Sequence, residues 1–176
     1  MRYFGLCLCL GLAFLQGKGQ SNIYGFSATA VDGTAINLSS FQGKKMLIVE
    51  AASQDSTFIQ YHDLQRLSEH FRDSLVIIVL PTNSFNSEPL DDGQLSQVFQ
   101  PSSGGQILVG VKVDVTGANI HPIFQWLTTA SANGIMDTPV NAPFKKFLID
   151  RNGRIAGVYS SKVNPMDITL FQAVQK

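Results

Sequence analysis

Cysteine is almost absent from this chain of 176 residues, because the only two, Cys7 and Cys9, both lie within the first ten positions. A reactive thiolate, a disulfide and a thiolate metal site all require cysteine. If the N-terminal residues are removed after synthesis, the remaining protein therefore has none of these three chemistries.

Charged residues are also scarce, at 15% of the chain against 44% hydrophobic residues. This composition predicts a packed core rather than disorder, and the length suits one domain. Thirteen basic and 13 acidic residues balance, and no basic stripe is visible. Nucleic acid is therefore not an expected partner.

The N-terminus has the pattern of a secretory signal peptide. Arg2 precedes the stretch Tyr3–Leu15, which is apolar apart from glycine and the Tyr3 hydroxyl, and Gly17 and Gly19 are small residues suited to a signal peptidase. We expect residues 1–19 to be removed, leaving residues 20–176 as one domain. A membrane anchor is the alternative, but a spanning helix needs about 20 apolar residues.

Cleavage after Gly19 would remove both cysteines together with Arg2 and Lys18. The mature protein would then carry 11 basic and 13 acidic residues, a net charge of −2. We expect it to be exported to a periplasm or to the extracellular space, with no membrane contact once the signal peptide is removed.

The hydrophobic pattern predicts alternating strands and helices. Two turn signals, Asp32-Gly33 and Asn152-Gly153, indicate β-hairpins, and the apolar runs Met46–Ala52 and Leu75–Leu80 indicate strands buried on both faces. Further strands are expected at Phe26–Ala30, Ala35–Leu38, Ile107–Val113, Phe144–Asp150 and Arg154–Ser160. Helices are expected at Thr57–Phe71 and Pro165–Val174. A third helix can start at Asn119, with Pro122 in its first turn, and continue through Leu127.

This order predicts an α/β protein with a thioredoxin-like fold. The expected architecture is a mixed central sheet flanked by helices, with an extra N-terminal β-hairpin.

Four segments, in order, resemble the glutathione peroxidase family. They are "IYGFSATAVDGTAINLSSFQGKKMLIVEAAS" (Ile23–Ser53), "LPTNSFNSEP" (Leu80–Pro89), "VKVDVTGANIHPIFQWL" (Val111–Leu127) and "FKKFLIDRNGRI" (Phe144–Ile155). The resemblance implies a catalytic set of cysteine or selenocysteine, glutamine, tryptophan and asparagine. It also implies a role in reducing peroxides and responding to oxidative stress.

None of these catalytic groups is kept at the matching positions. Asp55 replaces the cysteine or selenocysteine, Ser84 replaces the glutamine, and Ala142 and Pro143 replace the tryptophan and asparagine. An alternative register places Val140 and Asn141 at the last two positions, which would keep the asparagine. We therefore expect no catalytic residues of the family type, and no cofactor or metal.

Asp55 has two interpretations. It can cap the helix that follows, as aspartate does at helix N-termini, or it can bind a ligand or serve in acid–base chemistry. Glu50 interrupts a strand that should be buried, so we expect it to pair with Lys145 or Lys146, or to meet water at an edge. The alternative is a carboxylate couple with Asp55.

The three histidines are expected to have structural roles rather than to bind a metal. His62 and His70 are eight residues apart on one helix, too far to share a metal, and His121 precedes Pro122 in the family-like segment. Trp126 should pack on its helix. Pro143 lies where many thioredoxin-like proteins have a cis-proline, although an ordinary trans bond is the default.

Three functional hypotheses follow. The first is an exported, glutathione peroxidase-like pseudoenzyme that binds an unidentified protein or small molecule in a binding or accessory role. The second is a working oxidoreductase, as the resemblance implies. The third is another enzyme built around Asp55 and Glu50.

Overall fold

The computed structural model describes residues 22–100 and 104–176. The expected signal peptide and both cysteines lie outside these ranges. Within them, no helix is both long and apolar enough to cross a membrane.

A five-stranded mixed sheet forms the centre of the fold, in the order β5-β4-β3-β6-β7. Strands β3, β4 and β5 run parallel, and β6 and β7 are antiparallel to their neighbours. A separate hairpin of β1 and β2 turns at Asp32 and Gly33, as the sequence predicts. The strands are β1 (Ser27–Thr29), β2 (Ala35–Asn37), β3 (Lys45–Ala51), β4 (Leu75–Pro81), β5 (Ile107–Val109), β6 (Lys146–Ile149) and β7 (Ile155–Tyr159).

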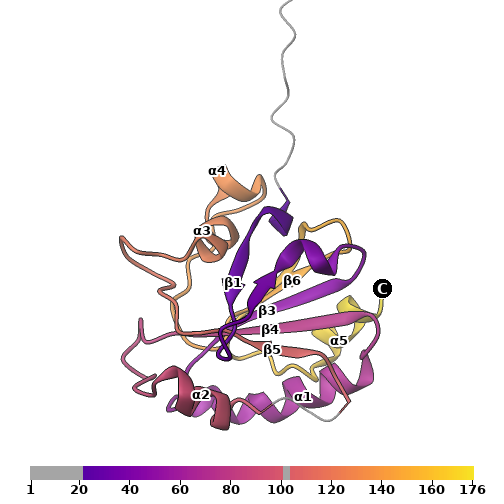
Figure 1. Cartoon of the computed structure of the whole chain (residues 1–176). Coiled ribbons are helices and arrows are strands. Elements are labelled where there is room, and N and C mark those ends of the chain that lie inside the picture. The colour runs from indigo at the N-terminus through magenta and orange to yellow at the C-terminus, as the bar shows by residue number, and fades with distance from the viewer. Residues whose placement is uncertain (1–21, 101–103) are drawn as a thin grey trace, which may run out of the picture.

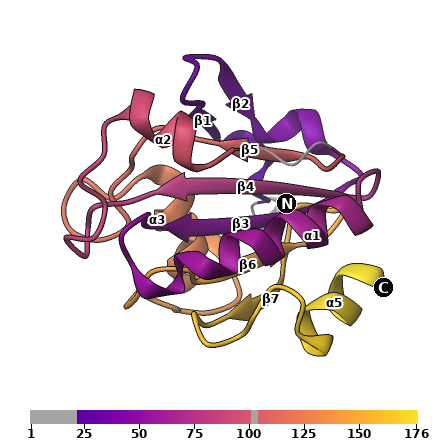
Figure 2. The ribbon, with the colours of Figure 1, turned by 90° about the horizontal axis from the view of Figure 1, so that it is seen from below.

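Helices cover both faces of the sheet (Figure 1). α1 and α2 lie below it in this view, and α3 lies above it with the β1–β2 hairpin. From below, α1 crosses in front of the central strands and α5 lies beside β7 (Figure 2). The helices are α1 (Tyr61–His70), α2 (Asp92–Val98), α3 (Pro122–Thr128), α4 (Ala130–Asn133) and α5 (Ile168–Gln175), with 3-10 turns η1 (Ile23–Gly25), η2 (Leu38–Phe41) and η3 (Ser56–Gln60).

Two hydrophobic clusters, one on each face of the sheet, form the core. Alternate residues of β3 point to opposite faces, so Leu47 and Val49 join the cluster under α1 and α5, while Met46 and Ile48 join the cluster under α3 and the hairpin. Because both faces are covered, every residue of β3 and β4 is buried. The mixed sheet, its flanking helices and the N-terminal hairpin confirm the expected fold class.

Several boundaries differ from the expected ones. The helix expected from Thr57 begins as the 3-10 turn η3 before α1, and the last helix begins at Ile168 rather than at Pro165. Helix α2 was not expected, although Asp91 and Gln94 form a capping box at its start. Such a pair three residues apart is a readable signal for a helix N-terminus.

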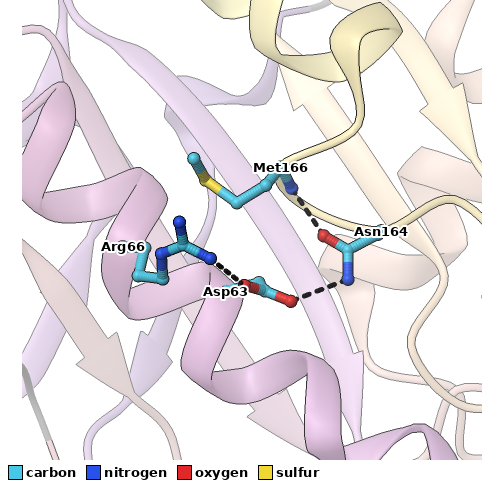
Figure 3. A network of polar contacts seen from close by, with 4 residues as sticks. All are labelled: Asp63, Arg66, Asn164 and Met166. Carbon is cyan, nitrogen blue, oxygen red and sulfur yellow. Dashed lines mark hydrogen bonds and ion pairs between the residues drawn. The ribbon is translucent and has the colours of Figure 1, made fainter.

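A polar network fixes the segment after β7 to α1 (Figure 3). Asn164 Nδ2 donates to Asp63 Oδ2 at 2.7 Å, and Asn164 Oδ1 accepts from the Met166 N–H at 2.8 Å. Arg66 Nη1 lies 3.1 Å from the other Asp63 oxygen. This network ties the segment before α5 to α1.

Candidate functional site

The loops that follow β3 and β4 meet at one edge of the sheet. The Gln54 N–H donates to the Ser87 carbonyl at 3.1 Å. Because β3 and β4 are parallel, their carboxyl ends share this edge, which is where open α/β sheets bind ligands. Asp55 lies in the first loop and Ser84 in the second, so the fold brings these two segments to the same edge.

Asp55 caps the helical segment that follows β3. Its Oδ1 accepts from the Thr57 N–H at 2.8 Å and also from the Thr57 hydroxyl. The backbone of Asp55 is extended (φ −84°, ψ 145°), as is usual for the residue before a helix. The cap interpretation is confirmed, and the side chain remains partly exposed.

Glu88 is a second carboxylate of this edge, and the sequence analysis missed its role. It is fully buried and accepts from Ser53 twice, from the N–H at 2.6 Å and from the hydroxyl at 2.8 Å. The Leu90 N–H adds a third bond at 3.3 Å. Glu88 thus holds the Asp55 loop against the loop after β4. The sequence feature that could have drawn attention to Glu88 was the Glu88-Pro89 pair, which lies in the second segment that resembles the family.

The Ser84 side chain forms hydrogen bonds within the loops at this edge. Its Oγ accepts from the Thr82 hydroxyl at 2.9 Å and from the Val115 N–H at 3.1 Å. These bonds connect the end of β4 to the segment that precedes α3. The hydroxyl therefore serves as a local tether in this arrangement.

Ala142 and Pro143 precede β6 at the same edge. Ala142 is exposed and Pro143 is buried. All peptide bonds among the described residues are trans, so the cis-proline alternative at Pro143 is wrong. Phe144 follows with φ +65°, a region that is rare for a bulky residue. Its N–H donates to the Glu50 carbonyl at 3.0 Å, which joins this segment to the end of β3.

Glu50 does not form the expected ion pair. Its Oε1 accepts from the backbone N–H of Lys145 at 3.0 Å, and its buried Oε2 has no partner. The only ion pair among the described residues joins Arg66 and Asp63. The Glu50 side chain is completely buried whereas Asp55 is partly exposed, and the negative charge of Asp55 adds to the desolvation that raises the pKa of Glu50.

Burial sets the charge states at this end of β3. Desolvation raises the pKa of Glu50 to about 8, against smaller opposing effects from the Lys145 N–H and the Lys146 charge. Desolvation also lowers the pKa of Lys146 to about 8, with Glu50 opposing the change. At neutral pH the acid is thus mostly protonated and the amine mostly charged.

The histidines are dispersed, as expected. His121 caps α3, where its Nδ1 accepts from the Ile123 N–H at 3.3 Å, and the helix begins at Pro122 rather than at Asn119. His62 and His70 lie on exposed positions of α1. Across residues 22–100 and 104–176, no three histidine, cysteine, aspartate or glutamate side chains form a possible metal site. Trp126 is buried in the core, which confirms its packing role.

The edge therefore offers the partly exposed carboxylate of Asp55, several hydroxyls, and the two buried carboxyl side chains of Glu50 and Glu88. These groups can donate and accept hydrogen bonds or hold a charge. They do not include a chalcogen that could attack a peroxide, because no cysteine follows position 9.

The amino-acid sequence is similar to those of known proteins. A family model described as glutathione peroxidase matches residues 23–128. The hydroperoxy fatty acid reductase of Synechocystis sp. is 36% identical over 163 residues, covering 88% of this chain and 95% of that protein. A glutathione peroxidase homolog of Bacillus subtilis is 34% identical over 150 residues, covering 84% and 93%.

Solved structures agree on the fold. The apo form of Trgpx superposes with a TM-score of 0.66 at 24% identity, covering 89% of this chain and 97% of that one. A thiol:disulfide interchange protein of the thioredoxin family from Chlorobium tepidum reaches a TM-score of 0.57 at 16% identity, covering 85% and 90%.

Proposed function

The chain belongs to the glutathione peroxidase family, and we propose that this member is an exported pseudoenzyme with a binding or accessory role. One observation carries the proposal. At the position that the family resemblance assigns to the redox cysteine or selenocysteine, Asp55 caps a helix and no thiol is available. A carboxylate cannot cycle through the oxidised states that thiol-based peroxide reduction requires.

The neighbouring positions support the same proposal. The Ser84 hydroxyl is committed to Thr82 and Val115, and Ala142 has no polar side chain. Positioned polar groups commonly supply several kcal/mol of barrier lowering in catalysis. A site without the chalcogen and without its polar partners keeps the fold while losing the basis for rapid peroxide reduction.

A working oxidoreductase is the second candidate, because the relatives named above are peroxidases or hydroperoxide reductases by name. A peroxide-consumption assay separates the two. We expect purified protein to consume no more hydrogen peroxide than a heat-denatured control, with either glutathione or thioredoxin as reductant. A Cys7→Ser, Cys9→Ser variant controls for thiols of the N-terminal segment. Turnover by this variant above the control would refute the proposal.

Export is part of the proposal and has its own test. We expect the protein recovered from an expressing bacterium to lie outside the cytoplasm and to begin near Gln20. Cytoplasmic protein that still begins at Met1 would contradict export without affecting the assignment of the site.

A further inference from the structure

A pocket of about 360 Å³ opens beside the inherited site, between the loop before β6 and the end of β7. Four polar side chains line it: Thr138, Asn141, Ser160 and Ser161. Lys145 also lines it and supplies the only charged side chain of its wall. The hydroxyls of Ser160 and Ser161 have no hydrogen-bond partner within the part of the chain that the structure describes, so both are available to a ligand.

The ammonium group of Lys145 is held firmly at this wall. Its Nζ donates to the Thr138 carbonyl at 3.0 Å, to the Thr138 hydroxyl at 2.7 Å and to the Pro139 carbonyl at 2.6 Å. An ammonium has three protons, so these bonds use all of them. The Thr138 oxygen accepts from the cation, which leaves its own hydrogen free to donate to a ligand.

The positive charge around the pocket has no close counterion. Neither Lys145 nor Lys146 forms an ion pair within the described ranges. The Lys146 ammonium lies 3.5 Å from the carbonyl of Ser160, a residue of the pocket wall. Glu50 is the one carboxyl near both lysines, and its pKa of about 8 leaves it mostly neutral at pH 7. An anion in the pocket would therefore meet unbalanced positive charge.

The rest of the wall is apolar. Pro139, Ala142 and Val158 complete the lining. Small-molecule sites typically combine such surfaces with a few placed polar groups. The lining thus suits a ligand with an anionic end and a compact apolar body.

We propose that this pocket binds a small organic carboxylate. Its oxygens would accept from the Thr138 hydroxyl and from the hydroxyls of Ser160 and Ser161, with the Lys145 charge behind Thr138. The apolar body would contact Val158 and Ala142. This inference rests on the proposed binding role and names the ligand class for it.

The test uses benzoate and its neutral isostere benzamide as probes on the full chain, followed by backbone amide NMR. We expect benzoate to shift the amides of Asn141, Ser160 and Ser161 with a Kd on the order of 1 mM, which is reasonable for a ligand of this size. Benzamide should bind at least ~10-fold more weakly, because it lacks the charge. Equal binding of the two probes, or shifts located elsewhere, would overturn the proposal.

Matched variants locate the charge. Lys145→Met keeps the length of the stem and should weaken benzoate at least ~10-fold, whereas Lys162→Met, at an exposed position outside the pocket lining, should change it less than ~2-fold. Thr138→Val removes the donor and should also weaken benzoate, which keeps the test decisive if Lys145→Met does not fold. Equal effects of the two lysine variants would refute the assignment.

Inorganic phosphate distinguishes an organic ligand from any anion. We expect it to bind at least ~10-fold more weakly than benzoate, because it gains nothing from the apolar wall. Phosphate binding as tight as benzoate would overturn the organic part of the proposal. If benzoate does not bind and the protein also fails to consume peroxide, the proposed ligand class is refuted but the pseudoenzyme proposal stands. If the protein consumes peroxide, the pseudoenzyme proposal itself is refuted.

Discussion

Replacing Glu50 by glutamine should remove a large pH dependence from the stability of this protein. The side chain is completely buried, and its only hydrogen bond is the 3.0 Å bond from the Lys145 N–H to Oε1. The unfolded chain releases this proton near pH 4.5, whereas the folded protein holds it until about pH 8. Between these values the folded state binds more protons, so the free energy of unfolding falls as pH rises.

The size of the effect follows from the two pKa values. At about 1.4 kcal/mol for each pH unit, the raised pKa of Glu50 in the folded protein lowers stability, relative to pH 4, by about 3 kcal/mol at pH 7 and by about 5 kcal/mol at pH 9, because the unfolded chain ionises there more readily than the folded protein. Glutamine keeps the acceptor for the Lys145 N–H and does not ionise. Glu50→Gln should therefore match the wild type near pH 4 and exceed its stability increasingly toward pH 9.

Lys146 adds a slope of the opposite sign. Its pKa is lowered to about 8 from 10.5, so the unfolded chain binds more protons between these values and stability rises with pH there. The wild type should therefore be least stable near pH 8. Lys146→Met should remove the rise above that pH.

Urea unfolding at pH 4, 7 and 9, followed by the fluorescence of the buried Trp126, measures these differences. Glu69→Gln, which neutralises an exposed carboxylate of α1, is the matched control and should show no such trend. A Glu50→Gln difference that stays constant with pH would refute the assignment of a buried, mostly neutral acid.

Three further predictions concern Asp55 and the network of Figure 3. Asp55→Ala should lower the free energy of unfolding by ~0.5–2 kcal/mol through loss of the cap, while Asp55→Asn keeps an acceptor and loses less; a higher melting temperature for the alanine variant would contradict the cap. The Asp55→Cys variant should react with an alkylating agent faster than a free cysteine at pH 7, because a helix start favours the thiolate. The same variant should reduce peroxide poorly, and family-like turnover would show that the other replaced positions matter little. Asn164→Ala should lower stability by ~1 kcal/mol in urea unfolding, since it removes the bonds to Asp63 and Met166; a loss no larger than that of exposed Lys162→Ala would contradict this.

Features that depend on neighbouring residues were readable from the sequence. The apolar runs of β3 and β4 showed that both strands would be buried, and the Asp32-Gly33 pair located the first hairpin. The Asp55 cap could also be inferred, because its partner Thr57 is two residues away. The capping box of α2 was equally local, so that helix was predictable in principle although it was missed.

The tertiary structure decided the charge states and the pocket. The sequence places an acid at position 50 and bases at 145 and 146, which favoured an ion pair, but the chain brings the Lys145 N–H rather than its ammonium to Glu50. That ammonium instead bonds to Thr138 and Pro139. The pocket, too, combines the loop before β6 with the end of β7, and its members are distant in sequence. Sequence determines such local features as caps, turns and strands because their partners are a few residues away, whereas burial and long-range contacts, which set a pKa or close a pocket wall, exist only once the chain has folded.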